Sequence, residues 1–366
     1  MIWYEETARA GISHVNSLFV GVSHAGPTII ADGKVVAPIG LTACAGRSVV
    51  EHVRAGARYD EMRPGMFEPA ARLADLDADG VWAQVLYPSV TLAGAKTYGD
   101  DRELQRFCVR SYNEWITDFC AAGQERLFAQ AIIPTTGVDD AVEELEFAIE
   151  HDHRGVVISR FPKGDFDYEP EDDAFFARAE EAGMPVAVHI GSFLRANPNH
   201  KWRSPDDLRY LGDTGTSKSG GHTLPVACDL LFSAMFEQFP ALEVVLVESN
   251  IGWIPTMLEQ CDDMFLRYRW FTGAVEKMTM MPSEVFARNF WATFMIDTAG
   301  LELRHHLNLD HVMWSTDNPH SGTDWPNSRI TMDRQFRGLP LDDVRKLVHT
   351  NARTLYRIPA PAESAG

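Results

Sequence analysis

The stretch His311–His320, HVMWSTDNPH, is the starting point for interpreting this chain. Its apolar run Val312–Trp314 has the length of a buried strand and stops at a polar sequence that begins with Ser315. Asp317 therefore lies just beyond the carboxyl end of a predicted strand. If that strand belongs to a closed parallel barrel, this end opens into the active site, and a carboxylate there indicates catalysis more than stability.

Six stretches upstream repeat this arrangement of an apolar run followed by a helical pattern. Together with HVMWSTD, the predicted strands are VWAQVLYP, LFAQAIIP, GVVISRFP, PVAVHIG, LEVVLVES and NFWATFMI. The runs are continuously apolar, which is typical of a parallel sheet covered on both faces. Seven such units fit either a doubly wound sheet or a (β/α)8 barrel.

The polar residues that end these strands favour the barrel. Tyr87, Arg160, His189, Glu248 and Asp317 each lie at the end of a different predicted strand. No glycine-rich phosphate loop follows any of the strands, which weakens a nucleotide-binding interpretation. Chemistry spread over many strand ends is typical of a barrel mouth, whereas a doubly wound sheet concentrates its ligand at one switch point. The predicted fold class is therefore α/β, a (β/α)8 TIM-like barrel.

The first 80 residues must supply the eighth strand. SLFVGV, residues 17–22, is the best candidate, with His24 just beyond its end. TIIADGKVVAPIG, which follows it, contains two short apolar runs around Asp32-Gly33, a hairpin turn signal. We predict one barrel domain over 1–366. It consists of an atypical N-terminal region with a small hairpin in 1–80, β/α units in 81–357 and a tail in 358–366.

Residues 193–221, after the strand PVAVHIG, form a polar segment rich in Asn, Ser, Asp, Gly and Lys. The segment is too long for an ordinary connection between a strand and a helix. Because it follows a barrel strand, we interpret it as a loop that covers the substrate. The alternative is a surface insertion with no role in the site.

Composition limits the class of partner. Lys and Arg total 33 against 52 Asp and Glu, a formal charge of −19, and such a surface repels nucleic acid and anionic lipid. We expect a small-molecule substrate and neither a nucleic-acid nor a membrane partner. The five cysteines are scattered without a C-x-x-C spacing, which favours a reducing compartment. With no secretory signal pattern and no apolar run of the roughly 20 residues that span a bilayer, we expect a cytoplasmic protein.

Several ordered motifs over roughly 35–357 resemble the amidohydrolase 2 family, in the branch that includes aminocarboxymuconate-semialdehyde decarboxylase and related aromatic-acid decarboxylases. These motifs are VVAPIGLTACAGRS, PAARLADLDADGVWAQVLYPS, SYNEWITDFCAAGQERL, PVAVHIG, VLVESNIGWIP, VMWSTDNPHSGTDWPNS and NARTLYRI. The resemblance implies a distorted (β/α)8 barrel with one divalent metal, and a dimer. It also implies hydrolysis, decarboxylation or hydration as the reaction.

The resemblance also implies metal ligands. His189 matches the family's fifth-strand histidine and Asp317 its eighth-strand aspartate, and imidazole and carboxylate suit zinc or manganese. The family's first-strand His-x-His pair is missing here, so either the chain begins downstream of that strand or part of the metal site is lost. His24 would be a third ligand if SLFVGV is the first strand. The alternatives are a metal-dependent enzyme, a metal-free lyase or hydratase, and a non-catalytic ligand-binding relative.

The predicted roles follow from position and residue type. Asp317 would act as acid and base on the substrate, with His189, Glu248 and His320 assisting. Glu248 has a second interpretation as a cap of the following helix, and Arg160 would bind a substrate carboxylate or form an ion pair at the rim. The substrate-binding candidates are Tyr87, Arg160, Trp253 and Asn250. The expected reaction is hydrolysis or decarboxylation of a small carboxylated or cyclic organic substrate.

Overall fold

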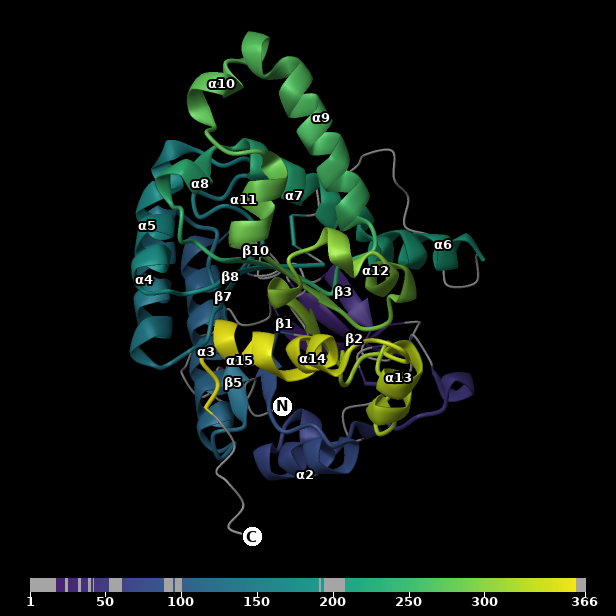
Figure 1. Cartoon of the computed structure of the whole chain (residues 1–366). Helices are drawn as coiled ribbons and strands as arrows, with labels where there is room; N and C mark the ends of the chain where they lie inside the picture. The colour runs from purple at the N-terminus through teal and green to yellow at the C-terminus, as the bar shows by residue number, and fades with distance from the viewer. Residues whose placement is uncertain are drawn as a thin grey trace.

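The computed structural model has an α/β architecture in which helices surround a parallel sheet (Figure 1). It describes residues 18–23, 26–31, 34–38, 41, 43–52, 61–88, 95, 101–190, 192–193 and 208–359. The α/β class predicted from the alternating strand and helix patterns is confirmed.

The parallel sheet contains all seven strands predicted from the apolar runs. They are β4 (Gln84–Leu86), β5 (Leu127–Ala129) with β6 (Ala131–Ile132), β7 (Val156–Ile158), β8 (Val186–His189), β9 (Val244–Val247), β10 (Phe290–Phe294) and β11 (Val312–Trp314). Only Gln130 separates β5, which pairs with β4, from β6, which pairs with β7, so these two segments are halves of one strand. Spatial order follows chain order, and every pairing in this sheet is parallel.

The sheet curls so that its first and last strands face one interior. Val85 of β4 and Met313 of β11 belong to the same apolar cluster, which a flat sheet of this length would keep apart. The cluster also includes Tyr356 from the C-terminal segment, whose hydroxyl lies 2.7 Å from that of Tyr87. Among the described strands, β4 and β11 do not pair with each other. A side-chain hydrogen bond of 3.4 Å from Gln84 to Thr316 spans the opening between them.

The outer face of the sheet packs against helices, as continuous apolar strands require. The helices are α2 (Pro69–Asp79), α3 (Arg102–Ala121), α4 (Val138–Glu150), α5 (Asp173–Glu181), α6 (Arg209–Thr216), α7 (Thr223–Phe232), α8 (Met235–Gln238), α9 (Ile254–Thr272), α10 (Ala274–Lys277), α11 (Pro282–Asn289), α12 (Thr298–Glu302), α13 (Ser328–Gln335), α14 (Leu341–Arg345) and α15 (Asn351–Leu355). Short 3-10 or π turns are η2 (Val49–Glu51), η4 (Pro64–Met66), η6 (Pro170–Asp172), η7 (Ser217–Gly221), η8 (Arg304–His306), η9 (Leu309–His311) and η10 (Lys346–Thr350). None of the described helices combines the length and apolarity needed to cross a bilayer.

Local sequence explains where these helices begin and end. The helix α2 has Pro69 in its first turn and ends at Gly80, whose φ of 71° is the left-handed conformation that glycine adopts readily. The helix α3 begins after Asp101, whose side chain accepts a hydrogen bond from the Leu104 N–H. Both helices pack beside β4 and thereby position the strand that opens the parallel sheet.

The N-terminal region corrects one prediction and confirms another. β1 (Leu18–Ser23), β2 (Gly26–Ala31) and β3 (Lys34–Pro38) form a separate antiparallel sheet, so the predicted hairpin is confirmed. The assignment of SLFVGV as the first parallel strand is wrong, because β1 pairs antiparallel with β2 and, among the described strands, with no other. The physical reason is the short connection after β1, since parallel neighbours need a crossover of a dozen or more residues. The division into 1–80, 81–357 and 358–366 stays a prediction.

A buried histidine makes stability depend on pH. His153, after α4, is 2% exposed and its Nε2 lies 2.7 Å from the Thr117 hydroxyl. Burial lowers the pKa of this imidazole to about 4, whereas in the unfolded chain it is about 6.5. As the pH falls from 7 to 5, the imidazole takes up a proton in the unfolded state but not in the folded state. The free energy of unfolding therefore decreases by about 2 kcal/mol through this group. Urea unfolding at both pH values checks this: His153→Gln should show a pH dependence smaller by that amount, and an equal dependence in both proteins would contradict it.

Candidate active site

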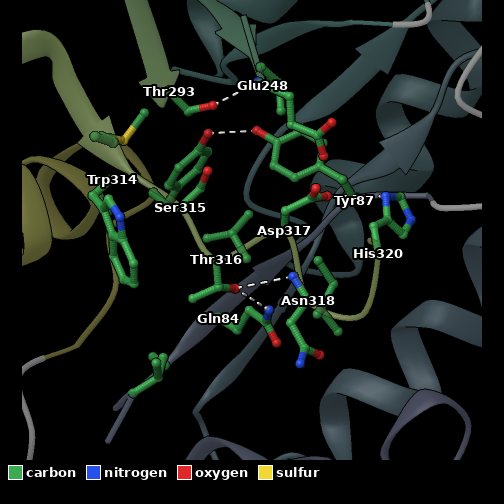
Figure 2. A pocket seen from close by; sticks show the side chains of 18 of the residues that line it. Gln84, Tyr87, Glu248, Thr293, Trp314, Ser315, Thr316, Asp317, Asn318 and His320 are labelled. Carbon is green, nitrogen blue, oxygen red and sulfur yellow. Dashed lines mark hydrogen bonds and ion pairs between the residues drawn. The ribbon is translucent and has the colours of Figure 1, made fainter. Parts of the chain in front are cut away.

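Four of the predicted site residues meet at one edge of the parallel sheet. His189 is the last residue of β8, Glu248 follows β9, and Asp317 and His320 follow β11. Because the carboxyl ends of parallel strands meet at the same edge, strands far apart in sequence present these side chains to one volume. Figure 2 shows Glu248, Asp317 and His320 around Tyr87, the residue that follows β4.

The four side chains form two contacting pairs. His189 Nε2 lies 3.4 Å from Glu248 Oε1, and His320 Nδ1 lies 3.1 Å from Asp317 Oδ1. One donor atom from each of Glu248, Asp317 and His320 lies within 4.8 Å of the other two. The side chains of His189 and Asp317 are only 3% and 4% exposed, so the pairs are held largely out of water.

The two carboxyl groups have opposite proton affinities. Burial raises the pKa of Glu248, but His189 and the nearby positive charges outweigh that effect and hold it well below its usual value. Burial, and then the charge of Glu248, raise the pKa of Asp317. Burial lowers the pKa of His320, yet its hydrogen bond to Asp317 and the surrounding negative charge raise it overall. Adjacent groups whose pKa values are driven apart are suited to separate acid and base roles.

The backbone around these residues is unusual. Glu248, Asn250 and Asp317 have φ values of 59°, 56° and 50°, in the left-handed region that non-glycine residues seldom adopt. Such conformations cost on the order of 1–3 kcal/mol and concentrate at functional sites. The N–H of Glu248 donates a 2.8 Å hydrogen bond to the Thr293 hydroxyl of β10, which ties the backbone of Glu248 to the neighbouring strand.

Lys218 is a site residue that sequence reasoning missed. It lies on η7, within the segment 193–221 that was predicted to cover the substrate, and its Nζ is 3.4 Å from Glu248 and 3.6 Å from Asp317. Of this segment the structure describes 193 and 208–221, and the second part reaches the site through the Lys218 side chain. The length of the segment and its position after a strand predicted the covering role, but no local signal distinguished Lys218 from the other polar residues.

The site opens into a cavity of about 220 Å³. Of the predicted residues, Tyr87, His189, Glu248, Asp317 and His320 line it. Apolar side chains from the strands and from the C-terminal segment complete the wall, among them Val247, Met313 and Ile358. The cavity therefore combines an apolar interior with a polar cluster at one side, as small-molecule sites usually do.

Three predicted substrate-binding residues lie elsewhere in the described structure. Arg160 donates to the Ser159 carbonyl at 2.6 Å and stacks over Phe166, and it does not line the cavity. Trp253 donates to the Ser249 carbonyl at 2.8 Å, and Asn250 donates to the Lys218 carbonyl at 2.9 Å. Trp253 and Asn250 therefore support the loops around the site and do not line it. His24 lies outside the described residues.

A polar wall of the cavity was also missed. Arg72 of α2 is 7% exposed, donates to the Asn318 side chain at 2.7 Å and lines the cavity with Gln84. Among the described residues, Arg72 Nε and Gln84 Oε1 have no hydrogen-bond partner although they are buried. Burial lowers the pKa of Arg72 to about 10, so the group is still a cation at neutral pH. A buried guanidinium with a spare N–H is suited to bind an anionic substituent.

The cluster also fits a divalent metal. Glu248, Asp317 and His320 offer two carboxylates and an imidazole, which are ligands that manganese and zinc accept. Three protein donors are the usual number for a catalytic zinc. His189, which sequence reasoning paired directly with Asp317, contacts Glu248 and is not a member of this triad.

A curled parallel sheet whose strand ends gather carboxylates and imidazoles in a cavity is typical of an enzyme's active site. The sequence profile of the amidohydrolase family matches residues 23–358. The chain therefore belongs to the amidohydrolase family, and it is an enzyme, a hydrolase or a carboxy-lyase.

Known relatives agree with this assignment. The gamma-resorcylate decarboxylase of Rhizobium sp. (strain MTP-10005) is 24% identical over 311 residues, covering 78% of this chain and 86% of the relative. The structure of 5-carboxyvanillate decarboxylase from Sphingomonas paucimobilis matches with a TM-score of 0.62 at 24% identity, over 79% of this chain and 82% of the other. The 5-carboxyvanillate decarboxylase from Novosphingobium aromaticivorans, complexed with manganese and 4-hydroxy-3-methoxy-5-nitrobenzoic acid, matches with a TM-score of 0.61 at 18% identity, over 78% and 79%. These structural likenesses show a shared fold.

Proposed function

We propose that this chain is a decarboxylase of a small aromatic carboxylate, acting at the mouth of a (β/α)8-type barrel. The observation that carries the proposal is the single cavity in which Asp317, paired with His320, faces the same space as the buried guanidinium of Arg72. Asp317 can transfer a proton, and the Arg72 guanidinium can bind an anion. The relatives support the choice of reaction, since those named above are decarboxylases of aromatic acids.

The reaction would be divided between two groups of residues that line the cavity. Arg72 and Gln84 hold an oxygen substituent of the ring, and the apolar side chains hold its faces. Asp317 in its protonated form donates to the ring carbon that bears the carboxylate. The bond from that carbon to the carboxylate then breaks, its electron pair returns to the ring, and carbon dioxide leaves. His320, hydrogen-bonded to Asp317, is placed to restore the proton.

A divalent metal belongs to the same proposal. Glu248, Asp317 and His320 would hold manganese or zinc. Such an ion, when bound, polarises oxygen substituents of a substrate. With or without the metal ion, the orientation of the substrate ring depends on Arg72 and Tyr87, which line the cavity.

The test is a substrate panel. The purified protein is incubated with hydroxybenzoates and methoxylated benzoates on one side, and with small esters, amides and lactones on the other, each with manganese, with zinc or with a chelator. Release of carbon dioxide with formation of the ring without its carboxylate supports the proposal. Turnover of the esters, amides or lactones alone would make the protein a hydrolase, and turnover of neither set would overturn the proposed substrate class.

Arg72→Lys is expected to raise KM for a carboxylated substrate roughly tenfold, because a lysine ammonium cannot reproduce the planar hydrogen bonds of a guanidinium. Steady-state kinetics measure this, and Arg160→Lys is the matched control, with KM expected within about twofold of wild type. The reverse pattern, in which only Arg160→Lys raises KM, would assign the anion contact to Arg160, as predicted from sequence, and not to Arg72.

Assembly and location stay predictions. A homodimer was expected from the family resemblance, and a cytoplasmic protein that acts on a small molecule, without a nucleic-acid or membrane partner, was expected from composition. Light scattering of the purified protein would decide the assembly.

A further inference from the structure

The turn that carries Lys218 is held tightly against the loop after β9. Gly220 in this turn has a φ of 83°, and a Cβ there would lie 2.6 Å from the Trp253 ring, so only glycine fits. The carbonyl of Lys218 accepts the 2.9 Å hydrogen bond from Asn250. These contacts place the Lys218 backbone beside the same loop that presents Glu248.

The side chain of Lys218 lies between the two carboxylates. Its Nζ is 3.4 Å from Glu248 Oε2 and 3.6 Å from Asp317 Oδ2, while the carboxylate side chains are only 12% and 4% exposed. Two carboxyl groups that share a buried site repel each other when both are ionised, and a cation beside both relieves that repulsion. Lys218 supplies this cation from within the chain.

The same two carboxylates are donors in the metal-binding triad. Glu248, Asp317 and His320 are the described residues whose donor atoms gather closely enough to hold an ion. An ammonium group that contacts both carboxylates offsets the negative charge that a divalent cation would require. Both cations would therefore draw on the same two carboxylates.

We propose that Lys218 is the internal counter-cation of the Glu248–Asp317 pair and competes with a divalent metal for it. The inference rests on the metal-binding part of the proposed function. It predicts that the wild-type protein binds a divalent ion weakly, because the ion must first displace the lysine from both carboxylates. Removing the lysine charge should therefore tighten metal binding, which is the opposite of what loss of an ordinary supporting contact would cause.

The test measures manganese binding to the whole protein without substrate. The dissociation constant of Mn²⁺, from calorimetry or from the spin resonance of free Mn²⁺, should be at least tenfold lower for Lys218→Met than for wild type. Lys218→Arg, which keeps the positive charge, should bind as weakly as wild type. Lys163→Met is the control, because the Lys163 ammonium contacts the exposed Glu171 at 3.2 Å, on η6; its affinity should stay within twofold of wild type.

Thermal unfolding gives a second readout and guards against a variant that folds poorly. Manganese should raise the Tm of Lys218→Met more than that of wild type, and Lys218→Gln should behave like Lys218→Met. Equal or weaker manganese binding in both neutral variants would overturn the proposal, and so would the lack of binding by every variant. Carbon dioxide release in the substrate panel is measured separately. If the neutral variants bind manganese more tightly but no substrate in the panel is decarboxylated, the decarboxylase proposal fails and the Lys218 proposal stands. If a substrate is decarboxylated but no variant binds manganese, the decarboxylase proposal stands and the Lys218 proposal fails.

Discussion

Replacing Asp317 with Asn is expected to lower kcat roughly a thousandfold, within the range that general acid–base groups contribute. The carboxamide has nearly the same shape but cannot deliver a proton to the substrate. Asp317 is buried, paired with His320 at 3.1 Å, and has a raised pKa caused by burial and by Glu248. No other described carboxylate combines these properties in the cavity. Turnover of the best substrate from the panel measures the loss.

The fold should survive this substitution. Asp263→Asn is the matched control, because Asp263 lies on the exposed side of α9 in an ion pair with Arg267 and faces no cavity. The thermal unfolding midpoints of both variants should remain near that of wild type. Activity of Asp317→Asn within about threefold of wild type would remove Asp317 from the mechanism.

Glu248→Gln is expected to lower kcat roughly a hundredfold and to weaken manganese binding by at least tenfold. The carboxylate contacts both His189 and Lys218, so its neutral replacement leaves those groups without their anionic partner. It also removes one of the three donors of the metal-binding triad. Both quantities are measured on the same preparation, turnover by substrate assay and affinity by manganese titration.

The control for this second substitution is Glu237→Gln. Glu237 is a surface carboxylate that accepts hydrogen bonds from Thr279, away from the cavity. Its turnover and manganese affinity should match those of wild type. If Glu248→Gln kept wild-type turnover, Glu248 would be only a structural residue of the loop after β9. The alternative prediction that Glu248 caps the following helix is wrong, because the N-cap of α9 is Trp253 and no side chain caps that helix.

Much of the architecture could be predicted because its signals are local. Each apolar run, such as Val186–His189 or Val244–Val247, marks a strand buried on both faces, whatever the rest of the chain does. Parallel strands end at a common edge, so the residues at those ends meet. This is why the sequence alone predicts that His189, Glu248 and Asp317 lie close together.

The errors arose where local patterns are ambiguous. SLFVGV is as strand-like as the others, but its short connection to β2 leads to antiparallel pairing. Arg160 ends a strand as His189, Glu248 and Asp317 do, yet its side chain stacks over Phe166 and is not among the residues that line the cavity. Strand-end position thus indicates the edge of the sheet at which a residue lies and does not indicate the direction of its side chain.

The sequence by itself determined the seven parallel strands, the family and the group of strand-end residues that meet at the site. Only the tertiary structure decided that Lys218 contacts both carboxylates and that Arg72 of α2 lines the same cavity. The physical reason is one of range. Apolar periodicity acts through neighbouring residues and is visible in a short window, whereas the contacts of Lys218 and Arg72 depend on how a covering turn and a helix pack against strands distant in the chain.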